Sequence, residues 1–185
     1  MSPLFRIYLI RGLIAIAWSI AFATVQHDLT AVSVALLVLY PVIDVVASLA
    51  DVRESSGTPG RRLQVFNTSL SALTAAGLGL AAISGIGAVL FVFGLWAVVA
   101  GAAQVVVALS RRRVLGWQWP SLLAGSFSVI AGATYLPVAL GDAPTLDMLV
   151  LYTAAGGTFF VLQSLLLAWR GRRRPVAPLT IRRPL

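Results

Sequence analysis

The chain consists mostly of apolar stretches that are each long enough to cross a lipid bilayer, and this feature restricts its fold more than any other. A membrane-spanning helix needs about 20 apolar residues. Six stretches reach this length, at residues 7–25, 29–50, 64–84, 86–109, 118–139 and 145–169. Because unpaired backbone groups are costly in hydrocarbon, these stretches predict six transmembrane helices.

The composition agrees with an all-α integral membrane protein. Hydrophobic residues make up 59% of the 185 residues and charged residues only 11%, whereas soluble domains carry about 25% charged residues. We therefore expect one six-helix transmembrane domain over residues 1–170. The Arg- and Pro-rich segment at residues 171–185 is predicted to be a disordered cytoplasmic tail.

Short polar connections divide the spans into three predicted hairpins, at about residues 5–52, 62–110 and 117–170. All fourteen basic residues are Arg, and none lies at the hairpin tips. Arg11 lies within the first span. The other thirteen lie at the ends of the spans that face away from the tips: Arg6, Arg53, Arg61, Arg62, Arg111, Arg112, Arg113, Arg170, Arg172, Arg173, Arg174, Arg182 and Arg183. The positive-inside rule then places both termini in the cytoplasm. The Ala-, Val-, Gly- and Leu-rich composition indicates a GC-rich bacterium, so we expect a multi-pass protein of the bacterial inner membrane.

An alternative interpretation concerns the N-terminus. Arg6 and Arg11, the apolar stretch that follows them and the small residues Ala21–Ala23 resemble a cleavable signal peptide. Its removal would leave five spans with the same orientation. The internal repeat described next argues against this interpretation.

A shift of 56 residues aligns three apolar segments, "LLVLY", "VFGLW" and "MLVLY", so that Tyr40, Trp96 and Tyr152 coincide. Each segment is followed by Arg soon afterwards. The pattern predicts parallel hairpin repeats, in contrast to the inverted repeats common among secondary transporters. We interpret the three aromatic residues as packing groups. Small residues at four-residue spacing predict close helix contacts, at Ala124, Ser128 and Gly132 and at Ala97 and Gly101.

A single carboxylate, Asp44, lies within the second span, where an unpaired charge is costly. Arg11 lies 16.5 residues before the centre of the first turn, at position 27.5, and Asp44 lies 16.5 residues after it. Because both helices rise by about 1.5 Å per residue, the two side chains should lie at one depth. We predict an intramembrane ion pair between Arg11 and Asp44 that locks the first hairpin. Proton or ion exchange at Asp44, or contact with another helix or a partner, remains open.

Other polar residues within the spans allow two interpretations. Asn67, Gln104 and Gln163 can form interhelical hydrogen bonds, which is the usual role of such residues. They can also line a polar path beside Asp44 in a small transporter or channel, which predicts a cavity that water reaches at that depth.

The sequence lacks the groups that most enzymes and metal sites need. It has no Cys, and its single His, His27, lies at a predicted turn. Neither a cluster of metal ligands nor a phosphate-binding glycine loop is present in the sequence. We therefore expect no enzymatic activity and no cofactor. A net charge of +8 without a groove-reading motif indicates contact with anionic lipid headgroups rather than with nucleic acid.

The segments "RGLIAIAWSIAFA" and "LVLYPVIDVVASLADVR" resemble the first hairpin of the HdeD-like family, small bacterial inner-membrane proteins built from three short hairpin repeats. Members commonly begin the first helix with Arg-Gly, and in the second an aromatic residue is followed four positions later by Asp or Gly. The matching residues are Arg11, Gly12, Tyr40, Asp44, Tyr152 and Gly156.

The resemblance extends to about Arg174, but Pro41 and the absence of Trp-Pro at the tips depart from it. It implies a non-enzymatic membrane protein in acid or envelope stress tolerance. The residues themselves leave two further classes open. One is the small transporter or channel, and the other is an accessory subunit of a larger membrane complex, with a homo-oligomer as a related possibility.

Overall fold

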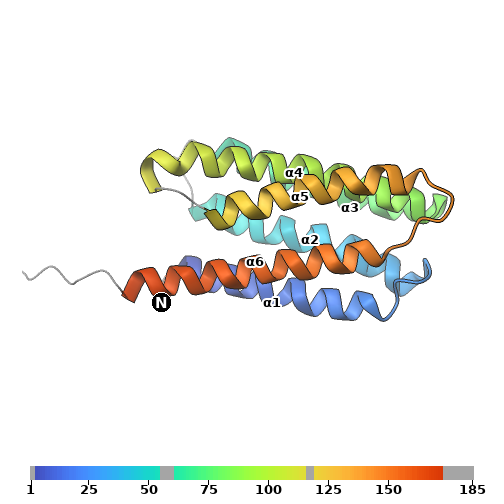
Figure 1. Cartoon of the computed structure of the whole chain (residues 1–185), viewed down its shortest axis with the longest axis horizontal. Coiled ribbons are helices and arrows are strands. Elements are labelled where there is room, and N and C mark those ends of the chain that lie inside the picture. Colours follow the sequence, from blue (N-terminus) through green and yellow to red (C-terminus); the bar gives the residue numbers. More distant parts are fainter. Residues whose placement is uncertain (1–2, 55–60, 116–118, 173–185) are drawn as a thin grey trace, which may run out of the picture.

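A computed structural model describes residues 3–54, 61–115 and 119–172, and this part of the chain is entirely helical apart from its turns (Figure 1). Six antiparallel helices run along one axis, and each is long and apolar enough to cross a membrane. They are α1 (Pro3–Ala23), α2 (Ala31–Glu54), α3 (Arg61–Ser84), α4 (Ile86–Leu115), α5 (Trp119–Ala139) and α6 (Asp147–Arg172).

Several helices extend beyond the apolar stretches that predicted them. The fourth span was expected at residues 86–109, whereas α4 runs to Leu115; the sixth was expected to end at residue 169, whereas α6 runs to Arg172. Helical hydrogen bonds continue into the Arg-rich segments because helix formation does not require apolar side chains. The apolar parts of the two helices, Ile86–Ser110 and Asp147–Trp169, end close to the predicted span limits at residues 109 and 169. Beyond Arg172 the predicted disordered tail lies outside the described residues.

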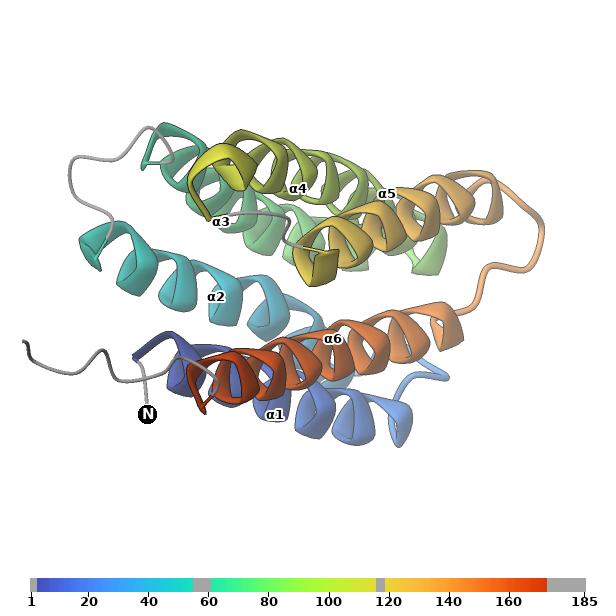
Figure 2. The same ribbon diagram turned by 60° about the vertical axis from the view of Figure 1, so that its left-hand side comes forward.

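The helices form a closed ring, most easily followed in Figure 2. Within the described residues each helix packs against its two neighbours along the chain, and α1 packs against α6 to close the ring. The most extensive contacts join α4 to α5, α1 to α6 and α2 to α3. The contacts of α1 with α2 and of α5 with α6 are much smaller. The closest packing therefore links helices of different predicted hairpins.

Paired glycines explain two of these close contacts. A β-carbon on Gly101 of α4 would lie 2.6 Å from the carbonyl oxygen of Gly125 on α5, and one on Gly12 would lie 2.7 Å from that of Gly157. Only glycine allows two helix backbones to approach this closely. Another glycine, Gly85, has φ of 109° and is the single residue between α3 and α4. This conformation favours glycine and makes the tight turn expected at Ser84–Gly87.

The two ends of the ring differ. We call the end where α1, α3 and α5 begin the basic end and the opposite end, with the short turns, the tip end. Toward the tip end large apolar side chains fill the centre, and they include Phe22, Leu37, Leu78, Phe93 and Leu149, all with exposed fractions of 0%. The indole of Trp18 donates to the carbonyl oxygen of Leu36 at 2.8 Å, so a polar group in this core is also satisfied. This half is a packed core.

Candidate functional site

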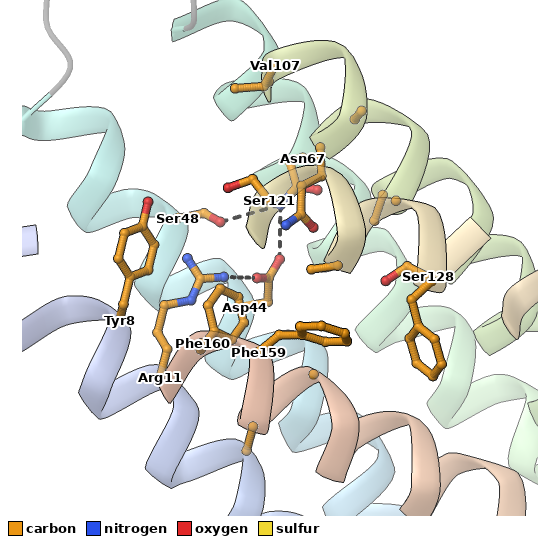
Figure 3. A pocket seen from close by; sticks show the side chains of 18 of the residues that line it. Tyr8, Arg11, Asp44, Ser48, Asn67, Val107, Ser121, Ser128, Phe159 and Phe160 are labelled. Atoms are coloured by element: carbon orange, nitrogen blue, oxygen red, sulfur yellow. Dashed lines mark hydrogen bonds and ion pairs between the residues drawn. The ribbon is translucent and has the colours of Figure 1, made fainter. Parts of the chain in front are cut away.

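The two charged residues that sequence spacing places at one depth meet inside the ring, toward its basic end. A guanidinium nitrogen of Arg11, Nη2, lies 2.6 Å from Oδ1 of Asp44 (Figure 3). Arg11 comes from α1 and Asp44 from α2, so the contact joins two helices that otherwise touch little. The guanidinium carbon also lies 4.8 Å above the ring centre of Phe160 on α6, in cation–π geometry. One side chain thus connects three helices.

Asp44 accepts further hydrogen bonds from α3. Nδ2 of Asn67 lies 3.0 Å and the hydroxyl of Ser71 lies 2.7 Å from Oδ2 of Asp44. The indole N–H of Trp96 donates in turn to the oxygen of Ser71 at 3.1 Å. A carboxylate away from bulk water needs such a set of donors in addition to its counter-ion. The network joins α1, α2, α3 and α4 around one anion.

A cavity of about 220 Å³ lies beside this ion pair, and all six helices line it. Its polar lining groups come from every helix, as Figure 3 shows for several of them. They include Tyr8, Arg11, Tyr40, Asp44, Ser48, Gln64, Asn67, Gln104, Ser121, Ser128 and Gln163. The side chains of Arg11 and Asp44 keep exposed fractions of 16% and 18%, so neither is completely buried. The site is a polar space inside an apolar protein.

The cavity extends toward the basic end and is closed toward the tip end. Leu63 and Ser121, within the first turn of α3 and of α5, belong to its wall at the basic end. At the other limit the rings of Tyr40, Trp96 and Tyr152 form its floor: the centroids of Tyr40 and Trp96 lie 5.9 Å apart, and those of Trp96 and Tyr152 6.5 Å apart. Phe93 packs behind all three, with centroids 5.2 to 6.1 Å away.

The structure brings the predicted polar residues into one lining, in different roles. Asn67 bonds to Asp44 and reaches the hydroxyl of Ser48 at 3.4 Å. Gln163 donates from Nε2 to the hydroxyl of Ser121 at 3.2 Å. Gln104 lines the cavity, and its amide has no hydrogen-bond partner among the described residues. The predicted polar path is thus a set of side chains around one space.

Sequence reasoning missed Ser71 and the hydrogen-bonding role of Trp96. The sequence did contain a signal for Ser71. Asp44 and Ser71 lie at equal distances along the sequence from position 57.5, in the connection between α2 and α3, and so do Ser48 and Asn67. The depth argument that pairs Arg11 with Asp44 applies equally to the connection between α2 and α3. The role of Trp96 had no such signal, since its aromatic ring was sufficient reason for its place in the core.

Fold and cavity together define the class: a polytopic α-helical membrane protein whose six helices enclose a polar cavity. Comparison of the chain with protein families, curated proteins and solved structures gives no match. The likeness to the HdeD-like family therefore stays a prediction from the quoted residues.

Proposed function

We propose that the protein is a small carrier that binds a solute in the cavity from the cytoplasmic side of a bacterial inner membrane. The observation that carries this proposal is the cavity itself, which holds a partly exposed ion pair and extends from its aromatic floor toward the basic end. A purely structural bundle gains stability from filling its centre. A space lined by polar side chains from all six helices is therefore better explained by a solute that enters it.

A carrier fits the arrangement better than a channel. A channel needs a continuous polar path, whereas Tyr40, Trp96, Tyr152 and Phe93 fill the centre of the ring on the tip side of the cavity. Carriers expose a site near the middle of the membrane to one side at a time. The positive-inside rule, applied to the Arg-rich basic end, makes the cytoplasm the side to which this conformation opens.

The hairpin repeat supports a site at the centre of the ring. Residues that are 56 positions apart line the cavity together: Tyr40, Trp96 and Tyr152; Asp44, Ala100 and Gly156; Ser48, Gln104 and Phe160. Three hairpins that each contribute one residue per level, around an axis along the membrane normal, would produce this pattern. Substrate sites at the interface between repeats are common among transporters.

Two other proposed functions have less structural support than the carrier function. Acid or envelope stress tolerance follows from the family resemblance alone, and no described contact favours it. A role as an accessory subunit or homo-oligomer has no specific observation in its favour. Contact of the basic end with anionic headgroups remains compatible with every one of these functions.

Thiol accessibility tests the carrier proposal directly. The chain has no cysteine, so a single introduced thiol is the only target. Gln104→Cys places it in the cavity wall, whereas Val106→Cys places it on the outer surface of the same helix, where Val106 is 48% exposed. Because the thiolate is the reactive species, a thiol in lipid reacts slowly with a charged, impermeant methanethiosulfonate.

We expect Gln104→Cys to react at least about tenfold faster than Val106→Cys, and only when the reagent is on the cytoplasmic side. Inside-out and right-side-out vesicles provide the two orientations. Equal, slow reaction at both positions would show that the centre of the ring is dry and would overturn the proposal. Fast reaction from the outer side alone would reverse its orientation.

A further inference from the structure

The chemistry of the cavity indicates what it binds, given the proposed carrier function on which this inference rests. We propose that the ligand is a small uncharged solute with both hydrogen-bond donors and acceptors, such as an amide or a polyol, and that the hydroxyl of Tyr40 and the amide of Gln104 bind it.

The charges in the cavity compensate each other. Among the described residues that line it, Arg11 and Asp44 alone are charged, and they lie in direct contact at 2.6 Å. Asn67 and Ser71 also donate to the carboxylate, so the anion has three donors before a ligand arrives. An entering ion would lose hydration without finding an unpaired counter-charge, which is costly. An uncharged polar solute avoids that cost.

Unused hydrogen-bonding groups remain in the wall. The hydroxyl of Tyr40 and the side-chain amides of Gln64 and Gln104 line the cavity and have no partner among the described residues. A hydroxyl and an amide each offer a donor and an acceptor. Polar groups in such a place bond either to water or to a solute that replaces water. A ligand with both kinds of group can satisfy all three side chains.

The repeat explains why Tyr40 is available. Trp96 donates to Ser71, and Tyr152 donates to Ser128 at 3.1 Å, so two of the three floor aromatics bond to a serine on the preceding helix. The two serines differ by one position in the repeat, and the corresponding residues of the first hairpin are Ala15, 56 residues before Ser71, and Ile16, 112 residues before Ser128; neither has a hydroxyl. Tyr40 therefore lacks the partner that the other hairpins supply. Its hydroxyl lies 3.8 Å from where a β-carbon on Gly156 would stand, across the ring on α6.

The size of the cavity limits the ligand. A volume of about 220 Å³ corresponds to about seven water molecules at ~30 Å³ each. It is smaller than the sites of about 300–1,000 Å³ that hold drug-sized molecules. A solute of a few carbon atoms with its hydrogen-bonding groups fits this space.

Three nearly isosteric probes test the ligand class. Acetamide is uncharged, acetate is its anionic counterpart and acetamidinium its cationic one. The readout is the rate at which uncharged methyl methanethiosulfonate modifies Ala100→Cys, one helical turn deeper in the cavity than Gln104, in the full chain in lipid nanodiscs. At equal osmolality, we expect acetamide to slow the reaction at least about threefold and the two ions to leave it unchanged.

Variants identify the binding groups. In the Ala100→Cys background, Tyr40→Phe should raise the half-protecting acetamide concentration about threefold to tenfold, the range for one lost hydrogen bond. Ala15→Ser provides a serine hydroxyl as a partner for Tyr40. It should therefore raise the half-protecting acetamide concentration as well, although the Tyr40 hydroxyl is retained. Tyr135→Phe is the matched control, because that hydroxyl donates to the carbonyl of Met148, away from the cavity lining.

The outcomes separate the two proposals. Absence of reaction at Ala100→Cys without any probe would count against the cavity and therefore against the carrier function. A reactive thiol that acetate or acetamidinium protects as well as acetamide does, or that acetamide fails to protect, would overturn the ligand class alone. Unchanged protection in Tyr40→Phe would remove that hydroxyl from the binding site.

Discussion

The tip half and the basic half of the ring are built from the same six helices but have opposite interiors. Toward the tips, Phe22, Leu37 and Phe93 have no exposed surface, whereas toward the basic end a cavity lies beside a partly exposed ion pair. Because the backbone arrangement is shared, the difference lies in the side chains at the centre. The tip half contains the tightly packed side chains that stabilise the fold, so the basic half can contain a cavity.

The transition between the halves occurs within about one helical turn. Tyr40, Trp96 and Tyr152 close the centre at one level. Four residues later along their helices the corresponding residues are Asp44, Ala100 and Gly156, which all line the cavity. Two of these three have almost no side chain. The cavity therefore exists because small residues follow large ones on two helices while a charged residue follows on the third.

The largest expected effect is in the packed half. Phe93→Ala removes a ring that contacts the rings of Tyr40, Trp96, Tyr135 and Tyr152. We expect the free energy of unfolding to fall by about 3–5 kcal/mol, as for other buried Phe→Ala changes. Steric-trap unfolding in lipid bicelles measures it. Phe91→Ala on the same helix, where Phe91 is 42% exposed, is the control and should cost little. Similar losses for both would mean that the tip half is not the stabilising core.

The ion pair should have the next largest effect. Asp44→Asn leaves Arg11 without its counter-ion, and Arg11→Gln does the reverse, so we expect each to lower the free energy of unfolding by about 2–3 kcal/mol. The double variant should lose less than the sum, with a coupling energy of about 1–3 kcal/mol. The same bicelle assay provides all four corners of the cycle.

An exposed carboxylate serves as the control for charge removal. Asp28 lies in the turn between α1 and α2 and is exposed, and Asp28→Asn should change the free energy of unfolding by less than about 0.5 kcal/mol. Additive losses at Arg11 and Asp44 would mean that their contact contributes no stability. The stability of the basic half would then come from the packing of the tip half alone.

The smallest and most specific effect distinguishes two adjacent glycines of α6. A β-carbon on Gly157 would lie 2.8 Å from Cγ1 of Ile16 and 2.9 Å from the carbonyl oxygen of Gly12, whereas one on Gly156 would have the Tyr40 hydroxyl, at 3.8 Å, as its nearest neighbour. Gly157→Ala should therefore cost about 1–3 kcal/mol by overpacking. Gly156→Ala should be neutral or stabilising by about 0.5–1 kcal/mol, because alanine favours the helix. Equal losses would place both glycines in helix packing and leave no free space at Gly156.

Hydropathy and charge were sufficient to predict the six helices and their antiparallel order, because the length of an apolar stretch follows directly from bilayer thickness. The depth argument also placed Arg11 opposite Asp44. The closed ring was not predicted, since Gly12 and Gly157 are 145 residues apart and apolar helices of similar composition offer no sequence signal for choosing partners. The cavity was raised only as a consequence of the transporter alternative.

The ends of the helices and the side-chain contacts at the floor of the cavity show a second limit of prediction from sequence. Hydropathy measures where lipid begins and not where helical hydrogen bonds end, so the predicted span at residues 86–109 agrees with the apolar part of α4, Ile86–Ser110, but gives no signal for the continuation of the helix to Leu115. Ser71 is one small hydroxyl among many in the spans, and its contact with both Trp96 and Asp44 depends on helix rotation. Rotation about the helix axis is set by packing against neighbours and not by composition.

The contact between α1 and α6 has a consequence for how the protein is made. Residues 24–146 must be synthesised before α6 can emerge, so the face of α1 that carries Gly12 waits in the membrane without its final neighbour. Without α6 the other five described helices lack the contacts that close the ring, so the ring can be completed only after α6 has inserted. The same geometry would allow α6, made as a separate chain, to complete a truncated protein.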